Sequence, residues 1–319
     1  MLFKRKNTYV FFLALFYCVW SIQFSYGYTW QDLWDHWMTS ATMVVGSLVA
    51  GSTPLGGGAV AFPVLTKVLH YSSQDARDFS ILIQSVGMTF ATLFFIARNV
   101  SIDWKVIIFL LPFTVIGQFL GYFISVDESS VKVIFSIFLI LFSLIFLSHK
   151  KFIIQNALYF HIGLMPVGII CGALCAFIGC GSDTLLFFYL ILFSKRQTLE
   201  TIPTSVCFMA INSLLSICVQ SMLSGGSSVH INVYDAWFFA APIVAVGAPL
   251  GGRILTQINP YFLYLLIYVL IAVEVISTII LVDFEFLYKS AMFVVMSYSI
   301  LKFMQYAINR PVLIEESQS

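Results

Sequence analysis

Residues 54–58 read Pro-Leu-Gly-Gly-Gly, and residues 179–183 read Gly-Cys-Gly-Ser-Asp. These two breaks interrupt long apolar segments, the first over residues 38–69 and the second over residues 157–194. A helix crosses the hydrocarbon core of a bilayer with roughly 20 residues, so each segment is too long for one span and short for two. Each segment is therefore predicted to be a re-entrant hairpin, which enters the membrane, breaks and leaves on the same face.

The composition of the whole chain is typical of a polytopic α-helical membrane protein. Of its 319 residues, 60% are hydrophobic and 10% are charged, whereas an average soluble domain carries roughly 25% charged residues. Sixteen Lys and Arg residues balance fifteen Asp and Glu residues, so no net field points to a polyanionic partner. This composition argues against a soluble enzyme, a disordered chain and a nucleic-acid-binding protein.

The remaining apolar segments predict full membrane spans at residues 78–98, 104–126, 131–148, 201–223, 235–256, 261–282 and 286–307. The apolar run near the N-terminus is either a first span or a signal peptide, because Ser25-Tyr26-Gly27 resembles a cleavage site. We expect five regions: residues 1–37, a span or signal peptide with an outer loop; 38–148, a first transporter repeat; 149–156, a cytoplasmic linker; 157–282, a second repeat; and 283–319, a final span and cytoplasmic tail.

The positions of basic residues predict the orientation, because cytoplasmic loops of membrane proteins are rich in Lys and Arg. Lys150 and Lys151 precede the second hairpin, and Lys195 and Arg196 follow it, so both of its ends are expected inside. Counting spans back from there places both ends of the first hairpin outside. The protein is expected to be a multi-pass protein of the cell (inner) membrane with a cytoplasmic C-terminus.

A repeated motif links the two halves. Pro112, Gly117 and Gly121 have the same spacing as Pro242, Gly247 and Gly251, and each break is followed by a Ser-Val pair. Each half then consists of a Gly-broken hairpin and three spans, and an odd number of spans inverts one half relative to the other. Inverted repeats with broken helices are typical of secondary transporters. The glycine run lacks the Lys-Ser/Thr of a phosphate-binding loop, so ATP-driven transport is not expected.

Two longer stretches resemble a known family. Residues 54–63 (PLGGGAVAFP) and 76–89 (ARDFSILIQSVGMT) resemble the first-half signature of the sulfite exporter family, TauE/SafE type. The second break with Asp183, followed by Pro203-Thr-Ser-Val206, also fits, and the resemblance covers roughly residues 38–282. It implies a membrane transporter, usually an exporter, of sulfite or small organosulfur anions. Cys180 and Ser182 stand where the family pattern has more glycine, which leaves the choice of substrate open.

The predicted substrate site combines the breaks with polar side chains on the spans that follow them. A helix that starts inside the membrane has free N–H groups and a positive dipole end, which suit an oxyanion. Hydroxyl and amide groups can hold an oxyanion without a buried cation. Tight turns and interhelical hydrogen bonds are the structural alternatives. The predicted substrate-binding residues are Gly56, Gly57, Gly58, Gln84, Ser85, Thr89, Gly179, Gly181, Thr204, Ser205 and Asn212.

Two carboxylates within apolar segments, Asp183 and Glu274, are candidates for coupling transport to protons, because intramembrane carboxylates are costly and often functional. Asp183 could instead cap the second arm of its hairpin. Arg77 is expected to pair with Asp75 or Asp78 rather than to attract anions.

The sequence therefore predicts a secondary transporter that exports sulfite or a related small sulfur-containing anion through a midplane site between two inverted repeats. The first alternative is uptake or export of thiosulfate, a sulfonate or a carboxylate. The second is a metal- or thiol-dependent membrane protein that uses Cys171, Cys175 and Cys180, although free cysteines are commonly small buried hydrophobes. We predict no catalytic residues, metal site or cofactor. The expected partners are a small anion and the lipid bilayer, with a homo-oligomer as a further option.

Overall fold

The computed structural model describes residues 2–124, 127–147, 153–154, 156–194, 198–224, 229–255, 257, 260–283, 285, 289–299 and 302. All regular secondary structure in these residues is helical, and six helices are long and apolar enough to cross a membrane. The predicted all-α membrane fold is therefore confirmed. Several residues that carry the orientation argument lie outside the described residues: Lys150, Lys151, Lys195, Arg196 and Arg310.

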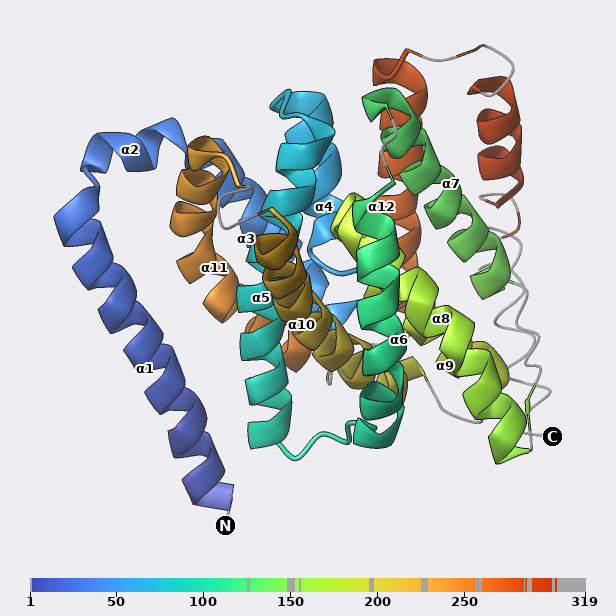
Figure 1. Ribbon diagram of the computed structural model, residues 1–319, viewed down its shortest axis with the longest axis horizontal. Coiled ribbons are helices and arrows are strands. Elements are labelled where there is room, and N and C mark those ends of the chain that lie inside the picture. Colours follow the sequence, from blue (N-terminus) through green and yellow to red (C-terminus); the bar gives the residue numbers. More distant parts are fainter. Residues whose placement is uncertain are drawn as a thin grey trace. The chain divides into compact units, whose positions relative to one another are not determined.

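The chain forms two compact units, one of residues 1–125 and 151–263 and the other of residues 126–150 and 264–319. Ribbons of both are drawn in Figure 1. The first unit contains α1 (Leu2–Gly27), α2 (Trp30–Asp35), α3 (Trp37–Ser52), α4 (Gly58–Pro63), the π-helix η1 (Val64–Val68), α5 (Ser73–Ala97), α6 (Trp104–Tyr122), α8 (Ala157–Ile178), α9 (Ser182–Phe193), α10 (Thr198–Leu223) and α11 (Ile231–Leu255). The second unit contains α7 (Glu128–Leu147) and most of α12 (Pro260–Leu281).

Each hairpin is followed by three further helices, of which α5, α6, α10 and α11 are long and apolar enough to cross a membrane, whereas the apolar stretches described in α7 and α12 are shorter. The first hairpin consists of α3, the first break and the continuous helix Gly58–Val68, and the second consists of α8, the second break and α9. The first arms of the two hairpins differ in length. The arm α8 is by itself long enough to cross a membrane, whereas α3 has 16 residues. The compact units do not coincide with the predicted repeats, since α7 and most of α12, which were predicted to end the two repeats, group together.

Glycines with left-handed backbone conformations form both breaks. Gly56 has a φ of +69°, Gly179 of +82° and Gly181 of +91°. Residues with a Cβ rarely adopt this conformation. It ends α8 at Gly179 and turns the chain sharply before α9 begins, which is why the apolar segment is broken there instead of forming one long helix.

The glycines of the repeated motif allow two helix pairs to pack closely. On α11, a Cβ added to Gly251 would collide with the Leu48 carbonyl oxygen of α3. On α6, a Cβ added to Gly117 would collide with the Ile169 carbonyl oxygen of α8. Small residues permit such contact between helix backbones in membranes. Each copy of the motif therefore packs its helix against the first arm of the hairpin that belongs to the other half.

Contacts at the helix ends show that the two hairpins open at opposite ends of α5. At the start of α5, Asp75 pairs with His230 at 2.8 Å, and the neighbouring Asp235 accepts a 2.7 Å hydrogen bond from the Tyr28 hydroxyl. The chain before α3 and the chain after η1 therefore reach the same end. Beyond the other end of α5, the Asp103 N–H donates to Thr204 at the start of α10. The second hairpin closes there, since the N–H of residue 154 donates to the carbonyl of residue 193 at 3.1 Å.

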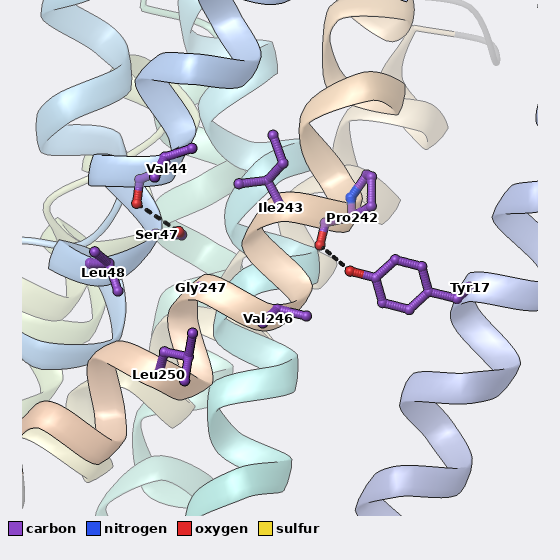
Figure 2. A pocket seen from close by; sticks show the side chains of 9 residues that line it. All are labelled: Tyr17, Val44, Ser47, Leu48, Pro242, Ile243, Val246, Gly247 and Leu250. Atoms are coloured by element: carbon purple, nitrogen blue, oxygen red, sulfur yellow. Dashed lines mark hydrogen bonds between the residues drawn. The ribbon is translucent and has the colours of Figure 1, made fainter.

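The N-terminal helix α1 makes specific bonds to α11. Pro242 has no N–H, so the Phe238 carbonyl loses its partner within α11. The Trp20 indole donates to that carbonyl at 2.9 Å, and the Tyr17 hydroxyl donates to the Pro242 carbonyl at 2.6 Å. Figure 2 shows the second of these bonds beside an open apolar groove of about 430 Å³, to which Val44 also contributes. These contacts anchor α1 to the first unit.

Candidate functional site

The two breaks are in direct contact, although they lie in different halves of the chain. The Thr184 hydroxyl at the start of α9 donates to the Pro54 carbonyl in the first break at 2.7 Å. A Cβ added to Gly58 would collide with the Cβ of Cys180 in the second break. Both contacts are fully buried. The start of α4 and the start of α9 therefore meet inside the first unit.

The start of α9 is attached to the middle of α8. The Ser182 hydroxyl donates to the Cys171 carbonyl at 2.6 Å, and the Cys171 thiol donates back to the Ser182 carbonyl at 3.3 Å. In the first hairpin, a Cβ on Gly57 would contact Ala50 and the Gly46 carbonyl in α3. Because each second arm begins beside the interior of its first arm, both helix starts lie well below the open ends of the hairpins.

Some backbone N–H groups at these helix starts have no recorded hydrogen-bond partner among the described residues. The first turn of α4 uses the Gly57 carbonyl, which accepts from the N–H groups of Val60 and Ala61. The structure records no hydrogen bond from the N–H groups of Gly57, Gly58 or Ser182 to a described residue. Such groups at a helix N-terminus require a partner when they are buried. The meeting point of the breaks can therefore donate hydrogen bonds to an oxyanion.

Two buried acceptors also face this point. The Gln84 Nε2 donates to the carbonyls of Ser80 (2.9 Å) and Gly179 (2.8 Å), which fixes the orientation of the amide. Its Oε1 has no partner among the described residues, and the same holds for Oδ2 of Asp183. A Cβ on Gly56 would stand 2.6 Å from the Asp183 Oδ2 and 3.0 Å from the Gln84 Oε1. Gly56, Gly58, Gln84, Gly179 and Asp183 are thus predicted residues that the structure brings together.

Asp183 was predicted either to couple transport to protons or to cap the second arm of its hairpin, and its two carboxylate oxygens differ in their surroundings. Its Oδ1 accepts a 3.0 Å hydrogen bond from the Thr184 N–H in the first turn of α9, which is a capping contact. The other oxygen is fully buried and unpaired within the described chain. Capping therefore accounts for only one of the two carboxylate oxygens.

The hydroxyl groups predicted on the spans have recorded bonds elsewhere. Ser85 donates to the Leu82 carbonyl at 2.7 Å, and Ser205 donates to the Ile202 carbonyl at 3.0 Å. These two bonds are equivalent in the two halves, and each stays within its own helix. Thr204 instead accepts from the Asp103 N–H and lines an open groove with Lys105 and Glu200. The buried Thr89 hydroxyl oxygen has no partner among the described residues.

Asn212 belongs to a network that holds the start of α9. Its Nδ2 donates to the Ser182 hydroxyl at 2.9 Å, and its Oδ1 accepts from the Gln118 Nε2 at 2.6 Å. All three residues are fully buried. Gln118 was not among the predicted site residues, although an amide within an apolar span is costly unless it is hydrogen-bonded. That cost is the signal by which Gln118 could have been found.

A second polar cluster lies beside the second break. Arg77 pairs with Asp78 at 2.7 Å, as predicted, and Gln220 donates to the same Asp78 oxygen at 2.9 Å. The Arg77 guanidinium also approaches the Ala176 carbonyl of α8 at 3.5 Å. A small cavity here is lined by Arg77, Gln118, Tyr122, Ala176, Ser216, Val219 and Gln220. Gln220 was also missed by the sequence analysis.

The remaining candidates have other surroundings. Glu274 belongs to the second unit, where its carboxylate accepts from the hydroxyls of Ser136 (3.1 Å) and Thr278 (3.3 Å). Within the described residues, no group of three or more His, Cys, Asp or Glu side chains could hold a metal ion. The thiol of Cys171 instead contributes to the attachment of α9 to α8.

Comparison with known proteins identifies the family. The family model described as "Sulfite exporter TauE/SafE" matches residues 39–278, a range that includes both breaks and every residue at their meeting point. No curated protein and no solved structure matches the chain. The match covers about three quarters of the sequence, so the chain belongs to the sulfite exporter TauE/SafE family of membrane transporters.

Proposed function

We propose that this protein is a secondary transporter of a small sulfur-containing oxyanion, with sulfite as the first candidate, and that the anion binds where the two breaks meet. The observation that carries this proposal is the contact between the breaks, which brings unpaired N–H groups from two helix starts to one buried place. Unwound backbone within a membrane is tolerated where it is buried in protein or lines a cavity.

The chemistry of the meeting point favours an oxyanion as the ligand. The N–H groups of Gly57, Gly58 and Ser182 supply directional donors, and the helix dipoles of the two second arms add positive potential. The missing side chains at Gly56 and Gly58 allow the backbone of the first break to approach Asp183, Gln84 and Cys180 closely. A small anion with several oxygens, such as sulfite, can accept from donors on both breaks at once.

We further propose that the two halves are inverted repeats that move against each other around this site. In support, the paired motifs pack α11 on α3 and α6 on α8, and the hairpins open at opposite ends of α5. We infer export as the physiological direction, an inner-membrane location and a cytoplasmic C-terminus. With an inside-negative potential, each exported negative charge gains about 2.3 kcal/mol per 100 mV.

The test is counterflow of radiolabelled sulfite in proteoliposomes that contain the purified full-length protein. Preloaded unlabelled sulfite is expected to drive uptake of labelled sulfite. Preloading with thiosulfate, a sulfonate or a carboxylate measures the alternatives in the same assay. Counterflow by one of these anions but not by sulfite would identify that anion as the substrate. No counterflow with any of them would contradict the proposed transport.

A further inference from the structure

The pairing of two buried acceptors beside Gly56 points to a bound proton. Both Asp183 Oδ2 and Gln84 Oε1 lie against the same backbone position, and neither has a partner among the described residues. We propose that the Asp183 carboxyl carries a proton that it donates to Gln84 Oε1, and that this protonated form is the one that admits the anion. The second part of this inference rests on the proposed function, whereas the protonation of Asp183 does not.

Gln84 can act only as the acceptor in this pair. Both hydrogens of its amide nitrogen are engaged by the carbonyls of Ser80 and Gly179. Rotating the amide would place its oxygen against those two carbonyls, with which it cannot form a hydrogen bond. The Gln84 oxygen is therefore held toward Gly56, and only a group that brings its own hydrogen can pair with it.

The surroundings of Asp183 supply no compensating cation. The elements packed around it carry these described titratable or charged residues: Tyr159, His161, Cys171 and Cys175 on α8, Cys180 in the second break, Tyr189 on α9, Lys67 in η1, Asp75, Arg77 and Asp78 at the start of α5 with Arg98 at its end, and Glu200, Cys207 and Cys218 on α10. Arg77 is engaged by Asp78, and Asp183 has no recorded ion pair with a described residue. A fully buried carboxylate without a cation favours its neutral form.

Protonation of Asp183 and binding of the anion are expected to support each other. An ionised Asp183 would repel an anion held by the N–H groups of Gly57, Gly58 and Ser182, and it would compete for the same donors. Transfer of one proton to Asp183 removes this charge, so the anion and the proton occupy the site together. When the site opens to the other side, the anion leaves and the proton dissociates to that side, which restores the carboxylate.

Infrared difference spectroscopy tests the protonated carboxyl without any assumption about the substrate. The full-length protein in lipid is titrated with acid and base in the absence of sulfite. The carbonyl band of a protonated carboxyl is expected to disappear in Asp183→Asn and to shift in Gln84→Met, which removes the acceptor. A set of protonated-carboxyl bands that is identical in the wild type and Asp183→Asn at every pH would overturn the proposal.

Counterflow at equal internal and external pH tests the linkage to the anion. Wild-type sulfite exchange is expected to fall about tenfold per pH unit on the alkaline side of the titration, and Asp183→Asn is expected to exchange with little dependence on pH. Glu274→Gln is the matched control, because that buried carboxylate accepts from two hydroxyls, and it should retain the pH dependence. An unchanged pH profile in Asp183→Asn would contradict the linkage, as would exchange that requires Na⁺ at constant pH. If the wild type exchanges no sulfite, the proposed function fails while the infrared result still decides the protonation.

Discussion

Gly56 and Asp183 face each other across the contact between the two breaks. A Cβ on Gly56 would stand 2.6 Å from the Asp183 Oδ2, and the glycine has a φ of +69°. Two independent constraints therefore require glycine at this position, one from its own backbone and one from a carboxylate in the other half of the chain. Because of this contact, a substitution in the first break directly affects a side chain of the second break.

Gly56→Ala is expected to destabilise the protein and to abolish transport. The left-handed backbone conformation alone costs an alanine about 1–2 kcal/mol, and the new methyl group also displaces Asp183 or Gln84. Thermal unfolding in detergent and sulfite counterflow measure the two effects. Gly27→Ala is the control, because a Cβ there meets nothing within 4 Å. Wild-type stability and counterflow in Gly56→Ala would show that the breaks do not pack as described.

Trp20→Phe is expected to cost about 1–3 kcal/mol, the range for leaving a buried acceptor unpaired. The indole satisfies the Phe238 carbonyl, which Pro242 deprives of its helical partner. In a Pro242→Ala background the helix can supply an N–H to that carbonyl, so the same Trp20 substitution should cost less. A double-mutant cycle on unfolding free energies measures the difference. Equal costs in both backgrounds would show that the indole does not compensate for the proline.

Asn212→Leu is expected to weaken anion binding and to lower stability by about 1–3 kcal/mol for each buried group left unpaired. The substitution removes the side-chain amide that links Gln118 to the Ser182 hydroxyl, although Gln118 Nε2 keeps its bond to the carbonyl of residue 212 and Ser182 keeps its bond to the Cys171 carbonyl. Ser213→Ala is the matched control on the same helix, because the one bond recorded for the Ser213 hydroxyl among the described residues is to the Ala210 carbonyl. The measurements are thermal unfolding and the sulfite concentration for half-maximal counterflow. Similar losses in the two variants would indicate that the network has no special role.

Residues at opposite ends of α5 are expected to be reactive from opposite sides of the membrane. Single cysteines at Gln74 and His230 should react with a membrane-impermeant maleimide from one side, and a cysteine at Asn99 from the other. These positions are exposed in the structure, and Asp75 pairs with His230. The native cysteines are first replaced by serine or alanine. Labelling of Gln74→Cys and Asn99→Cys from the same side would contradict the re-entrant hairpins.

The sequence was sufficient to predict the helical membrane fold, the two breaks and the family. Glycine clusters and the length of charge-free segments are local features, and both breaks were therefore visible before the structure. The pairing of Arg77 with Asp78 could also be predicted, because the two residues are adjacent in the chain. The compact units could not, since the grouping of α7 with most of α12 depends on contacts between distant segments.

The site was only partly predictable because composition does not show which polar group a side chain contacts. Ser85 and Ser205 were predicted as a symmetric pair at the site, but their recorded bonds are to carbonyls of their own helices. Thr204 contacts the start of α6 instead of a break. Gln118 and Gln220 are single amides in apolar spans, and their partners, Asn212 and Asp78, lie in other helices. Long-range hydrogen bonds of this kind leave no periodic signal in the sequence.

The most direct test of the central claim is to locate a bound anion. Selenite is a heavier analogue of sulfite, and its selenium can be located by anomalous diffraction from crystals of the full-length protein. We expect a selenium peak within hydrogen-bonding reach of the N–H groups of Gly57, Gly58 and Ser182. A peak beside Arg77 and Gln220, with none at the contact between the breaks, would contradict the account.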